Sequence, residues 1–378
     1  MNNFLHIISF DIPYPPNYGG IIDVFYKIKS LHKNGIKIIL HCFKYNDRQE
    51  SEEIEKLCDK VYYYNRNTSL AAHFSYLPYT VFSRKSKLLL KRLQEDEHPI
   101  LFEGLMSCYL INHKSLKNRI KIYRESNIEH DYYYELFKGT NNLKKKLFYI
   151  IESIKLKYFE KNIQAAALSL VVSTNDQKQL EERYPNKRIE FMPSFHANDE
   201  VSIIPGQSDY ILYHGNLSVA ENENAAIYLC NHVFSKLEYK CIISGLKPSQ
   251  KLIKVISNFN NIKLIANPNK AEMEKLMQEA QVHILVTEQC TGLKLKLLNT
   301  LFSGRHIVVN SNMLAGSGLD NLCNIADTPE AQITQCNTLM HEPFSTYLIE
   351  KRKSGLLPLY SNSYHAVQLK DILSSLTK

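Results

Sequence analysis

Residues 4–43 read FLHIISFDIPYPPNYGGIIDVFYKIKSLHKNGIKIILHCF, and this stretch decides the fold. The apolar run at 4–10 predicts a buried strand, and a loop rich in proline and glycine follows at 13–20. Apolar periodicity at 21–34 predicts a helix that ends at a glycine, and 36–43 is a second apolar run. Strand, helix and strand in this order predict a βαβ unit and therefore a parallel sheet.

The same alternation continues along the chain and then restarts. After further strand and helix signals, residues 193–207 have the composition of a linker, and a second α/β series begins at 210. A chain of 378 residues exceeds one compact domain. We therefore predict two doubly wound, Rossmann-like α/β domains joined near residue 200, with a ligand site at the carboxyl ends of their strands, in a central cleft that the two domains face.

Composition narrows the class of protein. The apolar share of 44% is that of a globular domain, and the net charge of +8 suits anionic substrates, acidic lipid or nucleic acid without choosing among them. The eight cysteines form no C-x-x-C pair, the first ten residues do not resemble a signal peptide, and no apolar stretch is long enough to span a membrane. We expect a cytoplasmic protein with reduced thiols.

Two glycines at the end of the first loop are candidates for anion binding. Gly19 and Gly20 follow a predicted strand and precede a predicted helix, which is the position of a phosphate-binding turn. The full G-x-G-x-x-G spacing is missing, so an ordinary tight turn explains the glycines equally well.

A second candidate anion site lies where the predicted strand at 282–286 leads into the helix at 295–302. Lys294 and Lys296 stand at the start of that helix, where cations oppose the helix macrodipole unless an anion is bound. They indicate a phosphate or diphosphate ligand, or else two solvated lysines. Gly215 and Asn216 end another strand, and Lys247 follows the next one as a third anion contact or an ordinary loop lysine.

Polar and titratable residues also follow two strands of the first half. The segment 124–130 includes Asn127, Glu129 and His130, and Glu103 occupies a similar place after the strand at 100–102. Such a cluster suits a hydroxyl-rich acceptor and the transfer of a proton, although a solvated loop has the same composition. No nucleophile–base–acid series and no metal-ligand spacing is present.

Two stretches are basic and amphipathic. One, on a helix predicted at 83–94, contains Arg84, Lys85, Lys87, Lys91 and Arg92. The other, on a long helix predicted at 143–167, contains Lys144–Lys146, Lys155 and Lys157. An apolar stripe facing the core with a solvated basic back explains both. Docking on an anionic membrane is the alternative, and nucleic-acid binding is a third, which no recognition module supports.

Taken together, these motifs resemble retaining glycosyltransferase family four, which has the GT-B fold, and the resemblance covers nearly the whole chain. The segments that carry it are Pro15-Pro16-Asn17-Tyr18-Gly19-Gly20, Asn127-Ile128-Glu129-His130, Val172-Ser173-Thr174-Asn175-Asp176, Met192-Pro193, Leu212-Tyr213-His214-Gly215-Asn216-Leu217, Gly292-Leu293-Lys294-Leu295-Lys296 and Ala315-Gly316-Ser317-Gly318-Leu319.

The resemblance implies transfer of a sugar from a nucleotide diphosphate to a hydroxyl of a polysaccharide or lipid-linked glycan, with retention and without an obligate metal or other cofactor. It implies an acceptor domain at 1–197, a donor domain at 198–359, and a helix at 360–378 that packs back on the first domain. Glu103 and His130 would be catalytic, and Asn127 and Glu129 would lie beside the acceptor. The donor would be bound by Gly19, Gly20, Gly215, Asn216, Lys247, Thr291, Gly292, Lys294 and Asn299.

One departure from the family pattern concerns the donor motif. The family has two glutamates separated by seven residues, and Thr291 and Asn299 stand in their places here. Asparagine can bind a ribose hydroxyl but brings no charge, and a charge-assisted hydrogen bond is about twice as strong as a neutral one. Two other functions therefore stay open: a catalytically silent protein that binds a glycan or a partner transferase, and a sugar-nucleotide epimerase.

Overall fold

The computed structural model describes residues 4–45, 48–289 and 294–376. The chain divides into two compact units, one comprising Met1–Ala197 with Asn362–Lys378 and the other comprising Asn198–Ser361. None of the helices in the described part of the chain has the length and apolarity that a membrane span requires.

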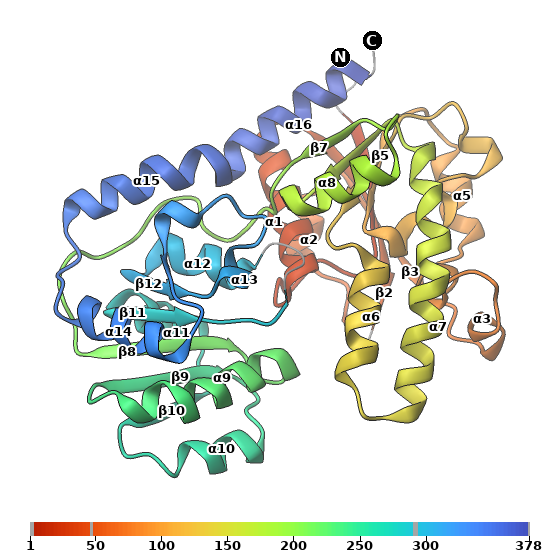
Figure 1. Ribbon diagram of the computed structural model, residues 1–378. Coiled ribbons are helices and arrows are strands. Elements are labelled where there is room, and N and C mark those ends of the chain that lie inside the picture. The colour runs from red at the N-terminus through yellow and green to blue at the C-terminus, as the bar shows by residue number, and fades with distance from the viewer. Residues whose placement is uncertain (1–3, 46–47, 290–293, 377–378) are drawn as a thin grey trace. The chain divides into compact units, whose positions relative to one another are not determined.

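The first unit is built on a seven-stranded sheet with the strand order β3-β2-β1-β4-β5-β6-β7, in which all neighbouring strands are parallel (Figure 1). Its strands are β1 (Phe4–Ser9), β2 (Lys37–Lys44), β3 (Lys60–Asn65), β4 (Ile100–Glu103), β5 (Lys121–Glu125), β6 (Leu168–Val171) and β7 (Ile189–Phe191). The inner strands are buried along their length because helices cover both faces, which is why their sequences are apolar runs rather than alternating ones.

The helices of the first unit come mostly from the first half of the chain. They are α1 (Gly19–Lys33), α2 (Glu52–Glu55), α3 (Leu70–His73), α4 (Tyr79–Phe82), α5 (Lys87–Leu93), α6 (Glu129–Gly139), α7 (Leu143–Phe159), α8 (Thr174–Arg183) and α16 (Asn362–Leu376), with 3₁₀ turns η1 (Leu105–Leu110), η2 (Lys114–Leu116) and η3 (Glu160–Ala165). The last helix, α16, puts Ala366, Leu369 and Ile372 into the same apolar core as β1 and α1.

Two helices differ from the sequence-based prediction. The basic helix predicted at 83–94 begins later, at Lys87, because Ser86 is its N-cap and the Ser86 hydroxyl accepts from the Leu89 N–H at 3.1 Å. The long helix predicted at 143–167 ends at Phe159, where the Asn162 side chain donates to the Phe159 carbonyl at 2.7 Å and the chain tightens into η3.

The second unit is built on a six-stranded parallel sheet with the order β10-β9-β8-β11-β12-β13. Its strands are β8 (Tyr210–Asn216), β9 (Lys240–Leu246), β10 (Ile262–Ala266), β11 (Val282–Leu285), β12 (His306–Val309) and β13 (Asn324–Ile325). Its helices are α9 (Ala220–His232), η4 (Phe234–Lys236), α10 (Gln250–Ile256), α11 (Lys270–Glu279), α12 (Leu295–Ser303), α13 (Ser311–Leu314), η5 (Asp320–Leu322), α14 (Pro329–Met340) and α15 (Thr346–Tyr360).

Both sheets have the doubly wound strand order that the sequence predicted. In each, the first strand lies inside the sheet, the next two strands extend to one side, and the fourth strand lies on the other side. The order therefore reverses between β1 and β4 in one unit and between β8 and β11 in the other. Ligands of such sheets bind outside the carboxyl ends of the strands at this reversal. These two edges are therefore the candidate ligand sites.

Candidate functional site

Two glycines bring β8 and β9 close together near the carboxyl edge of the second sheet. Gly215 and Gly245 are paired in register. A Cβ on Gly245 would lie 1.8 Å from the Gly215 carbonyl oxygen and 2.9 Å from the Leu217 side chain, so only glycine fits there. The two glycines therefore let β8 and β9 approach closely beneath the Leu217 and Asn222 side chains, since a Cβ on Gly215 would lie 3.2 Å from the Asn222 side chain.

A polar relay joins the end of β8 to the start of α12. The Lys296 ammonium donates to the Asn222 side-chain oxygen at 2.8 Å, and the Asn222 amide donates to the Asn216 carbonyl at 3.0 Å. The Tyr213 hydroxyl fixes Asn222 by donating to its carbonyl at 2.9 Å. Burial lowers the pKa of Lys296 to about 8 against the attraction of the Glu221 carboxylate, and neighbouring Lys294 also lowers it. An anion bound here would raise that pKa again.

The N-terminus of α12 is suited to an anion. Lys294 occupies the N-cap position, where an ammonium group cannot accept a hydrogen bond from the helix N–H groups, and the first turn contains no acidic residue. The partial positive charge of the helix end and two ammonium groups are thus gathered at one place. Thr291 and Gly292, which the sequence assigned to the donor, lie outside the described residues.

His214 holds α12 against β8. Its Nε2 lies 2.9 Å from the Thr300 hydroxyl, which itself donates to the Lys296 carbonyl at 2.8 Å. The hydroxyl proton is used in that second bond, so His214 Nε2 carries the proton that Thr300 accepts. Burial lowers the pKa of His214 to about 4, which keeps the ring neutral. His214 therefore positions the helix whose first turn carries Lys296.

The remaining donor candidates of the second unit differ in their surroundings. Asn299 is half-buried on α12, and its side-chain oxygen accepts from the Asn198 amide at 2.9 Å. Lys247 follows β9 with an exposed side chain, and its backbone has a φ of 49°. Its N–H donates to the Asn267 side chain at 2.7 Å, which fixes the turn.

In the first unit, the Phe10 ring packs against residues at the carboxyl edge of the sheet. A Cβ on Gly20 would lie 2.8 Å from the Phe10 ring, and one on Gly104, whose φ is 70°, would lie 3.5 Å from it and 4.0 Å from the Ser126 hydroxyl. Loops after β1, β4 and β5 and the start of α1 therefore meet around one ring. Packing on Phe10 accounts for the small residue at Gly20, whereas Gly19 is exposed at the start of α1.

The loop that carries these glycines is held by charged groups that sequence reasoning missed. Asp11 accepts from the Tyr18 hydroxyl at 2.7 Å and pairs with Arg48 at 3.3 Å. Arg48 also donates to the Pro15 carbonyl at 2.9 Å, and Arg84 donates to the Phe10 carbonyl at 2.9 Å. Burial raises the pKa of Asp11 and lowers that of Arg84 to about 9. The loop is thus preformed rather than organised by a ligand.

Glu103 lies in a buried ion cluster. It is 2% exposed, and both of its oxygens accept from the Lys27 ammonium at 2.8 Å. Lys27 also contacts Asp23 at 3.0 Å, and Asp23 pairs with Arg124 at 3.2 Å. Arg124 in turn donates to the Pro193 carbonyl at 2.9 Å. Two cations and two anions thus neutralise one another, and these contacts favour a structural role for Glu103 over the catalytic role that the sequence suggested.

Glu129 and His130 begin α6 but have different surroundings. Glu129 is 3% exposed, and burial raises its pKa to about 7, against the influence of Arg84. His130 turns toward Glu160, with Nδ1 at 3.2 Å from a carboxylate oxygen, and its Nε2 is 3.4 Å from Asp131. Asn127 is half-buried between β5 and α6. No interaction described for these side chains joins them to one another or to Glu103.

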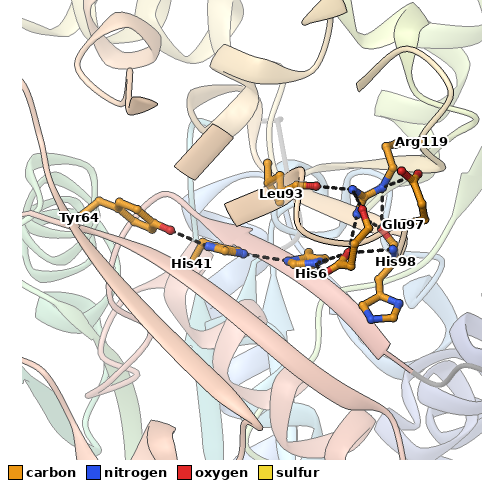
Figure 2. Close-up of polar contacts among 8 residues, drawn as sticks. His6, His41, Tyr64, Leu93, Glu97, His98 and Arg119 are labelled. Carbon is orange, nitrogen blue, oxygen red and sulfur yellow. Dashed lines mark hydrogen bonds and ion pairs between the residues drawn. The ribbon is translucent and has the colours of Figure 1, made fainter. Parts of the chain in front are cut away.

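A further group of titratable side chains lies away from this edge. Figure 2 shows a chain of contacts through the interior of the first sheet. The Asp96 carboxylate accepts from His6 at 3.0 Å, His6 and His41 are joined at 2.9 Å, and His41 lies 2.9 Å from the Tyr64 hydroxyl. Arg119 pairs with Asp96 at 3.1 Å.

Because Asp96 can only accept when ionised, the direction of every bond in this chain follows: Tyr64 donates to His41, and His41 donates to His6. Burial lowers the pKa of both histidines, so both rings are neutral. His6 pairs with Ile100, the first residue of β4, and is therefore remote from the carboxyl edge. The chain stabilises the sheet, and it does not belong to the candidate site.

Within the described residues, no group of three or more His, Cys, Asp or Glu side chains is arranged to hold a metal ion.

Comparison with known proteins identifies the fold. No family model matches the chain. A curated Klebsiella pneumoniae protein, described as an uncharacterized 44.6 kDa protein in the cps region, is 26% identical over 333 residues, which cover 83% of this chain and 84% of its own length.

Among solved structures, sucrose-phosphate synthase from Thermosynechococcus elongatus matches with a TM-score of 0.71 and 11% identity over 99% of both chains. TarM matches with a TM-score of 0.68 and 12% identity over 98% of both chains. Anabaena HepE in complex with UDP and glucose matches with a TM-score of 0.66 and 11% identity over 98% of this chain and 99% of its own. The chain thus has two parallel α/β sheets in the GT-B fold of sucrose-phosphate synthase and TarM, as predicted from its sequence.

Proposed function

We propose that this protein transfers a sugar from a nucleotide diphosphate to a hydroxyl of a growing polysaccharide or lipid-linked glycan, with retention at the anomeric carbon. One observation carries the proposal: the N-terminus of α12, with Lys294 and Lys296, at the reversal of the second sheet. Asn222, which accepts from the Lys296 ammonium at 2.8 Å, lies against Gly215 near the end of β8. A diphosphate needs such a place, because it brings two to three negative charges and no apolar surface.

The same groups would assist the reaction. As the bond between the sugar C1 and the diphosphate oxygen breaks, negative charge develops on the departing diphosphate, and ammonium groups with helix N–H donors stabilise that charge. The acceptor oxygen bonds to C1 and gives up its proton. We assign that proton to Glu129, which starts α6 at the carboxyl edge of the first sheet and whose pKa burial raises to about 7. Asn127, two residues earlier in the same loop, would orient the acceptor.

The relatives support this assignment. HepE was solved with UDP and glucose, and Staphylococcus aureus TarM with UDP and α-GlcNAc-glycerol. The Klebsiella pneumoniae relative belongs to a cps region, which supports a polysaccharide as the acceptor of this chain.

The test is a thermal-shift and calorimetric screen of UDP, GDP and their sugars against the full chain. We expect at least one nucleoside diphosphate to raise the melting temperature, and Lys294→Ala to abolish the shift. Lys254→Ala, on the exposed face of α10, is the matched control and should leave the shift unchanged. If no nucleoside diphosphate or nucleotide sugar stabilises the protein, the proposal is wrong.

A second candidate function is that of a catalytically silent GT-B protein. It is favoured by Asn299, whose side-chain oxygen is already engaged by Asn198 and which brings no charge to a ribose. Asn299→Glu separates the two functions. In a silent protein with a decayed site, the added carboxylate should strengthen nucleotide binding. In an enzyme adapted to asparagine, the same change should weaken binding and lower the rate of transfer.

A further inference from the structure

Helix α7 has a second apolar stripe that faces solvent. Its inner face buries Ser153, Leu156 and Phe159 against the unit. Opposite them, five large apolar side chains recur every three or four residues, with exposed fractions from 43% at Ile151 to 81% at Leu143. They are Leu143, Leu147, Ile151, Ile154 and Tyr158. A turn of about 100° per residue puts all five on one side of the helix.

This stripe continues onto a neighbouring loop. The Lys155 ammonium donates to the Ser75 carbonyl at 2.6 Å, which fixes the loop after α3 beside α7, as Figure 1 also shows. Phe74 and Tyr76, on either side of Ser75, are 88% and 87% exposed. Single exposed apolar side chains are common, but a contiguous group of this size marks an interaction surface. We call these seven apolar residues of α7 and the loop the α7 patch.

Lysines border the stripe on both sides. On the same helical projection, Lys144 and Lys155 lie along one side of it, and Lys146 and Lys157 lie along the other. The α7 helix has one acidic residue, Glu152, which is buried and accepts from the Tyr79 and Thr80 N–H groups at 2.9 and 2.8 Å. The outward face of the helix is therefore apolar at its centre and cationic at its border.

Neighbouring acids do not cancel this charge. On α6, which packs against α7, Glu135 pairs with Lys138 at 2.9 Å. At the far end of α7, Glu160 is buried and pairs with Arg183 at 2.6 Å. The other basic stretch of the sequence is different, because its Arg84 is buried on the Phe10 carbonyl and its Arg92 stacks on Tyr62. Only the α7 stretch keeps its lysines around an exposed apolar stripe.

We propose that the α7 patch docks on an anionic lipid surface. The apolar side chains would enter the boundary between headgroups and acyl chains, while the exposed Lys144 and Lys157 extend along it and place their ammonium groups among the lipid phosphates. The other two border lysines are held within the unit, Lys155 on the Ser75 carbonyl and Lys146 over the Phe137 ring. A helix whose centre is apolar and whose border is cationic matches both layers of such an interface. Exposed aromatic residues such as Phe74 and Tyr76 belong at the same depth.

A second copy of the chain fits the patch less well. Two α7 faces brought together would bury the apolar stripes, but they would also bring two lysine borders against each other without carboxylates to pair them. Like charges at that distance oppose association. The charge of the patch thus favours lipid phosphate over self-association, and this inference does not depend on the proposed transferase activity.

The experiment is flotation of the full chain with vesicles of phosphatidylcholine alone or with about one third phosphatidylglycerol. We expect binding to the anionic vesicles, weakened when salt is raised from about 0.05 to 0.5 M because lysine attraction is screened. Leu147→Ser with Tyr158→Ser should lower the partition coefficient by roughly tenfold to a hundredfold. Lys144→Gln with Lys157→Gln should lower it by about fivefold per lysine and flatten the salt dependence.

Leu88→Ser is the matched control, because Leu88 is 50% exposed on the other basic helix, α5, and should leave vesicle binding unchanged. The urea denaturation midpoint, measured on every variant, reports whether the fold is intact and keeps this test separate from that of the proposed function. Equal binding to both kinds of vesicle, no binding, or no loss in the Leu147→Ser/Tyr158→Ser variant would overturn the inference. So would a sedimentation-defined dimer that the same variant makes monomeric.

Discussion

The carboxyl edges of the two sheets have the same topology and opposite chemistry. At the edge of the first sheet, the charged groups of the cluster around Glu103 and Lys27 neutralise one another and are buried. At the edge of the second sheet, Lys294 and Lys296 stand at a helix N-terminus without an acidic residue in its first turn. The difference shows that the strand order indicates where on the sheet a ligand binds, whereas the balance of charge at that edge indicates which kind of ligand it accepts.

At the first edge, removing the buried lysine should strongly lower the stability of the protein. Lys27→Met leaves Asp23 and Glu103 buried without their shared cation, which should cost about 3–5 kcal/mol of the free energy of unfolding. Urea denaturation measures this loss. Lys33→Met, exposed near the end of the same helix, should change the stability by less than about 1 kcal/mol. If both variants lower the free energy of unfolding by the same small amount, the buried cluster does not stabilise this edge.

A backbone contact, and not a charge, should dominate the stability of the second edge. Gly245→Ala places a Cβ within 1.8 Å of the Gly215 carbonyl oxygen, so β8 and β9 must separate. We expect a loss of about 3 kcal/mol or more in the free energy of unfolding. Gly139→Ala serves as the control, since nothing lies within 4 Å of the added carbon. A Gly245→Ala protein as stable as the unmodified protein would remove the argument that β8 and β9 depend on this close approach.

Lowering the pH should destabilise the two units to different extents. Buried histidines are neutral in both, and a histidine whose folded pKa is below its unfolded value of about 6.5 destabilises the fold as the pH falls below that value. In the second unit, the pKa values of His214 and His283 are lowered by burial to about 4 and about 3. Each can remove about 1.4 kcal/mol per pH unit between about pH 6.5 and its folded pKa.

In the first unit, the lowered pKa values of His6 and His41 act in the same direction, but two carboxyl groups oppose them. The raised pKa of Glu129, about 7, means that its folded carboxyl takes up a proton before the unfolded one does, which favours folding as the pH falls from about 7 to 4.5. Burial raises the pKa of Glu125 as well. Hydrogen exchange between pH 7 and 5 should thus show the second unit opening first. Earlier opening of the first unit would contradict these assignments.

The smallest expected effect is on ligand affinity. Lys296→Met should weaken nucleoside diphosphate binding by roughly tenfold, the loss of one charge-assisted hydrogen bond, with little change in unfolding free energy. Isothermal titration calorimetry measures the affinity. A large loss of stability with unchanged affinity would instead make Lys296 a structural residue, like Lys27.

Much of this architecture could be predicted from the sequence, because apolar runs and strand-end glycines are local signals. The relay of Asn222 to Lys296 and the bracing of the first loop by Arg48 could not, since they join residues far apart in the chain. The ion pair between Asp23 and Lys27 could have been predicted, because the two residues are one helical turn apart in the sequence. It would have indicated the buried cluster that also contains Glu103. For α7, periodicity marks apolar positions but cannot say which face turns inward.

The central claim, that the second edge binds a diphosphate, is tested most directly by proton uptake. At pH 8, about half of the free Lys296 is neutral, because its pKa is about 8, and a bound diphosphate would restore the charge. Titration of UDP or GDP in two buffers of different ionisation enthalpy should therefore reveal uptake of up to about half a proton, which disappears in Lys296→Met. Binding without proton uptake, or no binding of either nucleotide, would contradict the account.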